Sequence, residues 1–358
     1  MDPLQLLPPG IGFTAPVAVT TVSATIACGF MLARFAGTRA REAAREREHE
    51  FETRLAEFLA GTLRGRDLLR VAARLEPDLF WGAVGGLRAH LARRAGNDLE
   101  QTLGRSRHVR AERNALRDGS PVRRELAARR LAWVGAARYR QALHRALRTG
   151  PEPVSVAAAV ALARVRDGAA LDWVLEHPAA FAHRTPRTRL ALLRAFSPGA
   201  APRLRAALAR GVGEPRMERA VIDALGIARC QDAAPLIAAR LAHEWRDVRV
   251  AAARALGKMR AVEQRVALSP LLRDPDWRVR AQTARALGRL AALEQITALR
   301  EALRDANWWV RHHAAYALAS LGDEGTRVLR EVAAGDADPF ARDIASEALA
   351  GGFPGPRT

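Results

Sequence analysis

Residues 274–290 read Asp-Pro-Asp-Trp-Arg-Val-Arg-Ala-Gln-Thr-Ala-Arg-Ala-Leu-Gly-Arg-Leu, and this stretch decides the fold because its parts recur along the chain. Its Ala-Leu pair is one of five that follow one another at intervals of 31 residues: 224–225, 255–256, 286–287, 317–318 and 348–349. A fixed period of this length is typical of stacked repeats rather than of a domain with one central core.

Each repeat has the spacing of a helix. Val279, Thr283, Ala286, Leu287 and Leu290 recur at three- and four-residue steps, which places them on one helical face. Seven residues before each Ala-Leu pair stands an apolar residue, and in four of the five units an arginine follows it. These arginines are Arg249, Arg280, Arg311 and Arg342, whereas the first unit has Glu218 instead.

A second, shorter apolar run precedes each of these helices, for example at residues 291–304. The turn between the two runs is Asp274-Pro275-Asp276 in one unit, where aspartate fits the N-cap and Pro275 would occupy the first helical position. The small residue of the Ala-Leu pair lets neighbouring hairpins approach closely. The sequence therefore predicts an all-α solenoid of stacked helical hairpins.

This pattern resembles the HEAT repeat family, and especially the short repeats of bilin lyase subunits, in which an Asp-rich turn precedes Val-Arg, small residues and Ala-Leu-Gly. The resemblance is strong over residues 214–350 and weaker upstream, so we expect the solenoid to span 76–350. It implies that the turn aspartate of one repeat pairs with the helix arginine of its neighbour, which would make Arg249, Arg280, Arg311 and Arg342 structural. It also implies a bilin-lyase-like modifying activity as an alternative function.

The N-terminal region differs from the repeats. No charged side chain occurs between Asp2 and Arg34, and the apolar run within 11–36 would be roughly 35 Å long as a helix. A cleaved signal peptide is the rival interpretation, but the segment lacks a basic start and a clear cleavage site. We therefore expect an uncleaved transmembrane helix at 11–36, with residues 1–10 exported. Arginines follow the span and none precedes it, which predicts a single-pass protein of the cell inner membrane with cytoplasmic repeats.

The segment 37–75 is rich in Arg and Glu and predicts a charged helix next to the membrane. Phe51, Leu55 and Phe58 offer a short apolar seam, so a coiled-coil dimer is the alternative. Two further helices at 79–94 and 99–117 would form a divergent first unit. Residues 351–358, rich in Gly and Pro, predict a flexible tail.

The formal net charge of +19 raises nucleic acid as a partner, but Lys258 is the only lysine among 57 basic residues. Such a preference for arginine is typical of a GC-rich coding sequence, whatever the function. We expect the charge to attract anionic lipid headgroups or acidic protein surfaces, and nucleic acid to be an unlikely partner for a tethered solenoid.

The repeat register also predicts a binding face. Residues of the second helices that point away from the Ala-Leu seam would line the concave side of the solenoid. There they form a groove that passes from basic through aromatic to acidic residues, ending at Asp343 and Glu347; a solvated face without a partner is the alternative. Trp245, Trp277 and Trp308 fall near the repeat period and are expected to pack on neighbouring hairpins. The candidate partner-binding residues are Arg254, Lys258, Arg285, Arg289, Trp309, His312 and Tyr316.

The chain lacks the common signatures of catalysis. Its two cysteines and scattered histidines suggest no metal site, and no phosphate-binding glycine loop or nucleophile elbow is present. We therefore expect no enzyme activity and no cofactor. The favoured function is a membrane-anchored scaffold that binds an acidic segment or a membrane protein complex; the alternatives are a modifying enzyme and a nucleic-acid-binding HEAT-like protein.

Overall fold

The computed structural model describes residues 42–88, 93–197 and 199–351, and these form helices and turns without any strand. The predicted span at 11–36, the exported segment 1–10 and all but the first residue of the tail 351–358 lie outside the described residues. Among the described helices, none is both long enough and apolar enough to cross a membrane.

The chain divides into two compact units, of which the first comprises residues 1–114 and 133–135. It contains a helix over residues 42–59, and Phe51 and Leu55 of this helix are fully buried. The Phe51 ring lies 5.7 Å from that of Phe80, so the apolar seam packs within the unit and is not free for a coiled coil. The labelled helices here are α2 (Gly65–Ala72), α3 (Pro77–Arg88), α4 (Arg93–Leu103) and α5 (Arg107–Asp118), the last of which crosses the boundary.

Two expected helices of this region are interrupted in the structure. The predicted helix 37–75 stops at residue 59, and the turn that follows contains Gly61 with a φ of +78°, a conformation that glycine adopts at little cost. The predicted helix 99–117 is divided between α4 and α5. Gly61 and Gly104 mark both turns in the sequence.

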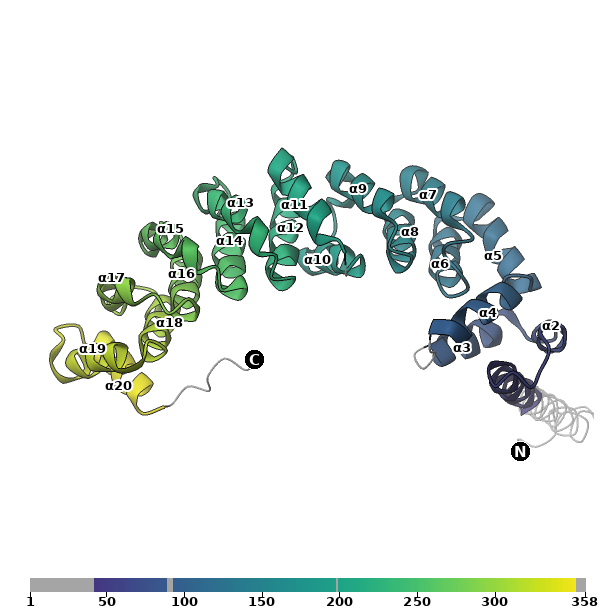
Figure 1. The fold of residues 1–358 in the computed structure, drawn as a ribbon, viewed down its shortest axis with the longest axis horizontal. Coiled ribbons are helices and arrows are strands. Elements are labelled where there is room, and N and C mark those ends of the chain that lie inside the picture. Colours follow the sequence, from purple (N-terminus) through teal and green to yellow (C-terminus); the bar gives the residue numbers. More distant parts are fainter. Residues whose placement is uncertain (1–41, 89–92, 198, 352–358) are drawn as a thin grey trace, which may run out of the picture. The chain divides into compact units, whose positions relative to one another are not determined.

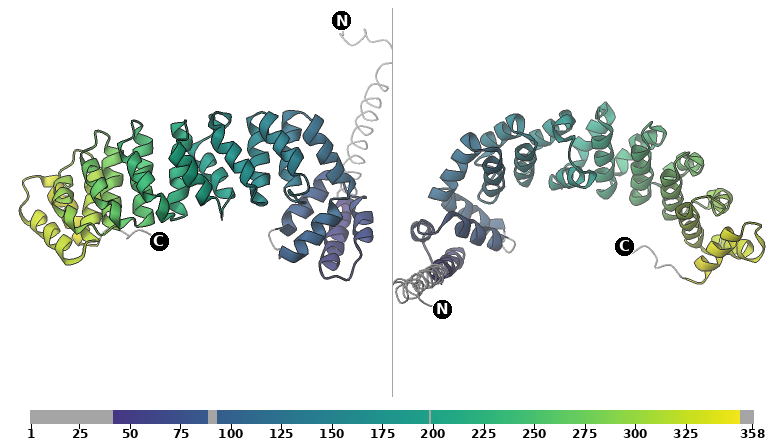
Figure 2. Two further views of the ribbon diagram at one scale, coloured as in Figure 1. Left: turned by 45° about the horizontal axis from the view of Figure 1, so that its top comes forward. Right: turned by 180° about the vertical axis from the view of Figure 1, so that it is seen from behind.

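The second unit holds the repeats, whose helices form two rows in Figure 1 and in both views of Figure 2. Within this unit, the second helix of each hairpin lies on the inner side of the curve that the hairpins follow. The prediction of an all-α solenoid is thus confirmed. Its α-helices are α6 (Pro121–Leu131), α7 (Arg140–Thr149), α8 (Glu152–Arg164), α9 (Gly168–Glu176), α10 (Pro186–Ala195), α11 (Ala201–Arg210), α12 (Pro215–Ile227), α13 (Ala234–Ala238), α14 (Arg246–Met259), α15 (Arg265–Leu268), α16 (Trp277–Arg289), α17 (Ile296–Ala302), α18 (Trp308–Ala319), α19 (Gly322–Gly335) and α20 (Pro339–Leu349).

The first helices of the regular repeats are short and partly 3₁₀. Helix α15 has only four residues between η4 (Val262–Gln264) and η5 (Ser269–Arg273), and Pro270 near the start of η5 removes a backbone donor. One to three residues after the second helices α12, α14, α16 and α18, the backbone is left-handed at positions 229, 260, 291 and 322, although only the last of these is glycine. The repeat therefore fixes this backbone turn independently of residue type.

The Ala-Leu seam is the buried contact between adjacent second helices. Leu287 is fully buried, as are its counterparts Leu225, Leu256 and Leu318. Leu349 of α20, in contrast, is 37% exposed. Gly288, which follows the pair, has special importance because a Cβ atom there would lie only 2.7 Å from the Cα of Ala317 on the next second helix. Glycine at this position allows α16 and α18 to touch backbone to backbone.

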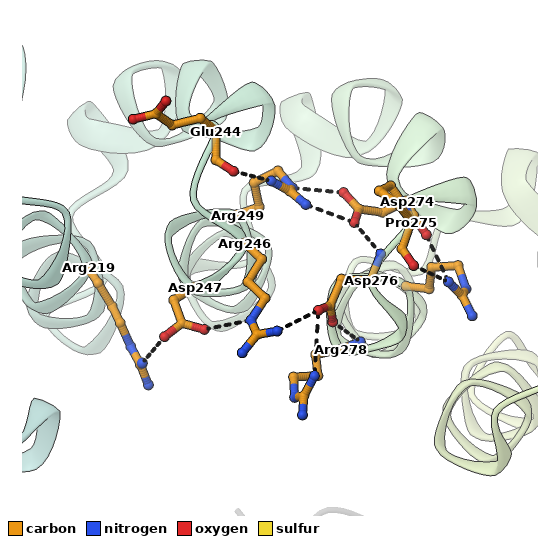
Figure 3. A network of polar contacts seen from close by, with 10 residues as sticks. Arg219, Glu244, Arg246, Asp247, Arg249, Asp274, Pro275, Asp276 and Arg278 are labelled. Carbon is orange, nitrogen blue, oxygen red and sulfur yellow. Dashed lines mark hydrogen bonds and ion pairs between the residues drawn. The ribbon is translucent and has the colours of Figure 1, made fainter.

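The turns between the helices are joined by ion pairs from one repeat to the next, as Figure 3 shows. Arg249 donates from Nε and Nη2 to both oxygens of Asp274, over 2.8 and 3.0 Å, and from Nη1 to the carbonyls of His243 and Glu244 in its own turn. Arg280 repeats this pattern with Asp305. The pairing implied by the resemblance is therefore present in these two repeats.

The N-cap of the second helix α16 differs from the prediction. It is Asp276, whose side chain accepts a bond from the Arg278 N–H over 2.8 Å, and Pro275 lies in the turn before the helix. Asp274 instead accepts from the Asp276 N–H and from Arg249. The two aspartates of the turn thus have separate tasks, one as a cap and one as a tie between repeats.

The series of ties changes at the last repeats. Asp336 accepts from Nε and Nη2 of Arg304, which follows the preceding first helix. Arg311 does not pair with it and instead stacks 5.1 Å above the ring of Phe340. Arg311 and Arg342 still donate to carbonyls of their own turns. All four arginines of the column are structural, but only Arg249 and Arg280 bridge to the next turn aspartate.

Candidate binding face and cleft

The seven candidate residues lie on three successive second helices, a surface that we call the second-helix face. Arg254 and Lys258 belong to α14, Arg285 and Arg289 to α16, and Trp309, His312 and Tyr316 to α18. Because the helices are adjacent in the stack, the repeat register places these side chains on one side of it. Their surroundings nevertheless differ from one residue to the next.

Arg254 is held by a neighbouring repeat. Its Nε and Nη2 donate to the two oxygens of Asp223, each over 2.9 Å, and both side chains are largely covered. Asp223 precedes Arg254 by 31 residues and so begins the same column of the repeat register. The 31-residue spacing of this pair is therefore visible in the sequence.

Lys258, Arg285 and Arg289 form a cationic group without such compensation. None of them makes a hydrogen bond or an ion pair to another side chain in the part of the chain that the structure describes. Burial lowers the pKa of Lys258, and the charge of Arg254 lowers it further against the opposing effect of Asp223. Burial and the neighbouring charge of Arg285 likewise lower the pKa of Arg289. The group therefore remains electrostatically unfavourable in the absence of an anion.

Helix α18 carries a connected group of rings. Trp308 stacks on His312 with ring centroids 4.6 Å apart, and His312 meets Tyr316 edge to face at 4.7 Å. Trp309 is 49% exposed. Trp308 and Trp245, which were expected to pack on neighbouring hairpins, are 43% and 48% exposed. Their position beside the inter-helix turn leaves much of each ring uncovered, so that expectation was wrong for both.

A cleft of about 750 Å³ opens beside these cations and rings. Four of the seven candidate residues line it, namely Arg285, Arg289, His312 and Tyr316, whereas Arg254, Lys258 and Trp309 do not. Arg260 and His313 also line it and were not singled out from the sequence. His313 was expected to point to the other side of α18 from His312, but both rings face the cleft.

The cleft lies where the glycine column ends. Gly226, Gly257 and Gly288 each receive the backbone of an alanine from the next second helix, whereas the corresponding residue of α18 is Ala319. Ala319 is exposed and lines the cleft together with Ser320 and Ala348. Helix α20 contacts α18 less extensively than α16 does, as expected where a methyl group replaces the glycine hydrogen that allows close backbone approach.

The two histidines of the cleft are held neutral. Burial is the main cause that lowers the pKa of His313 to about 4, and the neighbouring His312, Arg285 and Arg289 lower it further because each disfavours a second positive charge. Burial also lowers the pKa of His312, against the opposing charge of Glu347. At neutral pH the rings can therefore donate hydrogen bonds without adding positive charge. Among the described residues, no group of His, Cys, Asp and Glu is arranged to hold a metal ion.

Comparison with known proteins agrees with this geometry. The family model described as HEAT repeats matches residues 265–350. This segment is thus similar to HEAT repeats. It comprises α15 to α20 and therefore all helices that line the cleft. No curated protein matches the sequence.

Solved structures show the HEAT-like fold over a longer part of the chain. Kap121p aligns with 12% identity and a TM-score of 0.53, and a mutant of Kap121p with 13% identity and a TM-score of 0.54. Both alignments cover 84% of this chain but only 39% of the other, so the chain spans about two fifths of the length of Kap121p. At such low identity the likeness concerns the fold alone.

Proposed function

We propose that this protein is a membrane-anchored scaffold whose second-helix face binds an acidic segment of a partner protein. The observation that carries the proposal is that Arg285 and Arg289 have no side-chain hydrogen bond or ion pair among the described residues, whereas Arg249, Arg254 and Arg280 on α14 and α16 are paired with carboxylates. Cations that repel one another lower stability, and an anionic partner relieves this repulsion.

The contrast with other arginines supports this choice of surface. Arg249, Arg254 and Arg280 each meet a carboxylate of an adjacent repeat, so their charge is used within the fold. Arg285 lies on the same helix as Arg280 and is exposed without a partner among the described residues. Its charge remains available for a second molecule.

Exposed aromatic residues at the starts of two second helices would add apolar contact area to such a surface. Trp308, Trp309 and Phe340 are 43%, 49% and 62% exposed at the starts of α18 and α20. Trp and Arg are the residue types that most often dominate the energetics of protein interfaces. An acidic segment with apolar side chains would therefore find both kinds of contact here.

Membrane attachment is proposed from the sequence. The uncharged segment 11–36 is long enough to span a bilayer, and the arginines that follow it favour a cytoplasmic solenoid and an inner-membrane location. An anchor would confine the solenoid to partners at the membrane surface, such as a membrane protein complex or the cytoplasmic tail of a membrane protein. The same cations would also be drawn to anionic headgroups.

The test measures binding of a fluorescently labelled glutamate-rich peptide to the full chain in an uncharged detergent. We expect the Arg285→Glu, Arg289→Glu double variant to weaken binding by about tenfold or more, because two attractions become repulsions. Arg330→Glu is the matched control, since Arg330 is exposed on α19 and makes no hydrogen bond or ion pair within the described residues. Equal affinity of the double variant and the control variant would argue against the proposed surface.

The same variants can be tested against natural partners. Crosslinking in membranes followed by affinity purification should recover fewer partner proteins with Trp309→Ala, Arg285→Glu than with the wild type or with Arg330→Glu. Unchanged recovery would place the partner on another surface.

A further inference from the structure

The cleft has two chemically different parts. Arg260, Arg285 and Arg289 supply three guanidinium groups, and no aspartate or glutamate lines the cavity. The remaining wall is formed largely by small apolar residues, with the rings of His313 and Tyr316. These small residues are Gly288, Ala291, Ala317, Ala319, Ala348 and Gly351.

The three arginines carry more positive charge than one carboxylate can neutralise. The side chains of Arg260, Arg285 and Arg289 make no hydrogen bond or ion pair to another of the described residues. Each guanidinium offers several N–H groups in a planar fork, a geometry that suits phosphate oxygens as well as carboxylates. A carboxylate brings a single charge, whereas a phosphomonoester brings nearly two at neutral pH and three outer oxygens.

The size of the cleft also bears on the ligand. A cavity of about 750 Å³ is far larger than a phosphoryl group and lies within the usual range of sites for small organic molecules. The apolar wall suits an organic group attached to the anion. The Tyr316 hydroxyl and the neutral imidazoles add polar groups to the wall, whereas the Ser320 hydroxyl donates to the Ala317 carbonyl.

We propose that this cleft binds a phosphomonoester, with the phosphoryl group between Arg285 and Arg289 and the organic group against Tyr316 and the alanine wall. The site rests on the proposed function only in that it belongs to the second-helix face. The phosphomonoester is either a free small molecule or a phosphorylated side chain on the partner segment, and both present the same chemistry to the arginines.

The test compares two small probes by calorimetry on the full chain in an uncharged detergent at pH 8. Phenyl phosphate and phenyl sulfate share the ring and the tetrahedral anion but carry about two charges and one charge, respectively. We expect phenyl phosphate to bind about tenfold more tightly. Equal affinities, or no binding of phenyl phosphate, would overturn the proposal.

Variants separate the site from general attraction to a basic protein. Arg289→Gln should weaken phenyl phosphate binding about tenfold, and Arg289→Lys should weaken it less because the charge remains while the planar fork is lost. Arg330→Gln should leave the affinity unchanged. A similar loss in Arg289→Gln and Arg330→Gln would mean that net charge alone attracts the probe, and would overturn the site. Thermal unfolding monitored by circular dichroism confirms that each variant is folded.

Two peptides identify the source of the phosphoryl group and distinguish this site from the scaffold function. An acidic peptide containing phosphotyrosine should bind more tightly than its unphosphorylated form if a protein carries the group, whereas binding of phenyl phosphate alone would indicate a free small molecule. Binding of both peptides with equal affinity, without binding of phenyl phosphate, would overturn the phosphomonoester site and leave the scaffold function standing. Binding of phenyl phosphate but of neither peptide would support the phosphomonoester site and contradict the scaffold function.

Discussion

Arg280 and Arg285 lie five residues apart on α16, yet their environments give them different roles. Arg280 donates to both oxygens of Asp305, and both partners are largely covered. Arg285 points into the cleft without a carboxylate partner among the described residues. The difference arises from neighbouring repeats, since a carboxylate lies beside one arginine and not beside the other.

The tie at Asp305 predicts a pH-dependent contribution to stability. Burial opposes ionisation of Asp305, but hydrogen bonds from Arg280 and from the Asn307 N–H outweigh this effect and hold its pKa below the usual value. A depressed carboxyl pKa stabilises the folded state above the unfolded pKa of about 4, and this contribution is lost as the pH falls through the folded value. We expect Asp305→Asn to lower the free energy of unfolding by about 2 kcal/mol at pH 7 and by much less at pH 3.

Urea unfolding at the two pH values measures this difference. Asp232→Asn is the control, because Asp232 is exposed and makes no hydrogen bond or ion pair within the described residues. An equal loss for both variants, or a loss at pH 3 as large as at pH 7, would show that the Asp305 tie does not act in this way.

At the residue scale, the sequence predicted the structural arginines better than the binding ones. Arg249 and Arg280 were identified because the resemblance included their aspartate partners. Arg254 was predicted as a partner-binding residue without its link to Asp223, which stands one period before it. Arg260 could not be recognised as part of a cleft, because it follows α14 in a turn whose left-handed backbone is not evident from an arginine.

At the scale of the helices, the packing of neighbouring second helices depends on the presence or absence of single methyl groups. Gly288 faces the backbone of Ala317, whereas Gly335 near the end of α19 has no atom within 4 Å of the position that a Cβ would take. The two glycines therefore have opposite tolerance for substitution, even though both belong to helices.

We expect Gly288→Ala to destabilise the protein by about 1–3 kcal/mol, because the added methyl group must push α16 and α18 apart. Gly335→Ala should be neutral or stabilising by up to about 1 kcal/mol, because alanine restricts the unfolded chain and favours a helix. Denaturant unfolding of the two variants gives the comparison. A Gly288→Ala protein as stable as the Gly335→Ala protein would contradict the close backbone contact.

The sequence predicted which elements exist better than where they begin and end. The apolar spacing predicted each second helix correctly. The N-cap of α16, however, is Asp276 and not the predicted Asp274, because Asp274 binds Arg249. The first helices divide into α and 3₁₀ segments, and the helix expected at 37–75 is broken near Gly61. Side-chain partners and turns determine these boundaries, and periodicity does not record them.

At the scale of the whole molecule, the repeats and the N-terminal segment supply different information. The repeats are a one-dimensional series of contacts between neighbours, so their fold follows from a short period. The identity of a ligand does not follow from it, because a solenoid can present many surfaces. The cleft in particular lies where Ala319 replaces the glycine of the repeat, and a pattern shared by all repeats does not show such a departure.

The proposed topology is tested by fusions at the C-terminus of the full chain. An alkaline phosphatase, active only after export, should be inactive there, and a fluorescent protein that matures in the cytoplasm should be bright, because the arginines after residues 11–36 favour retention on that side. The same fusions to a chain that lacks residues 1–36 serve as the control and should give the same signals from the soluble fraction. An active phosphatase and a dark fluorescent fusion of the full chain would reverse the orientation.

The change from glycine to Ala319 also has an evolutionary consequence. Glycine and alanine codons differ by one base, so a single point mutation is enough to open or close a recess between two neighbouring hairpins. A binding site in such a chain can arise without any insertion and can move by one period when the substitution occurs in another repeat. The location of a recess is therefore a variable that selection can change rapidly, while the rest of the stack is preserved.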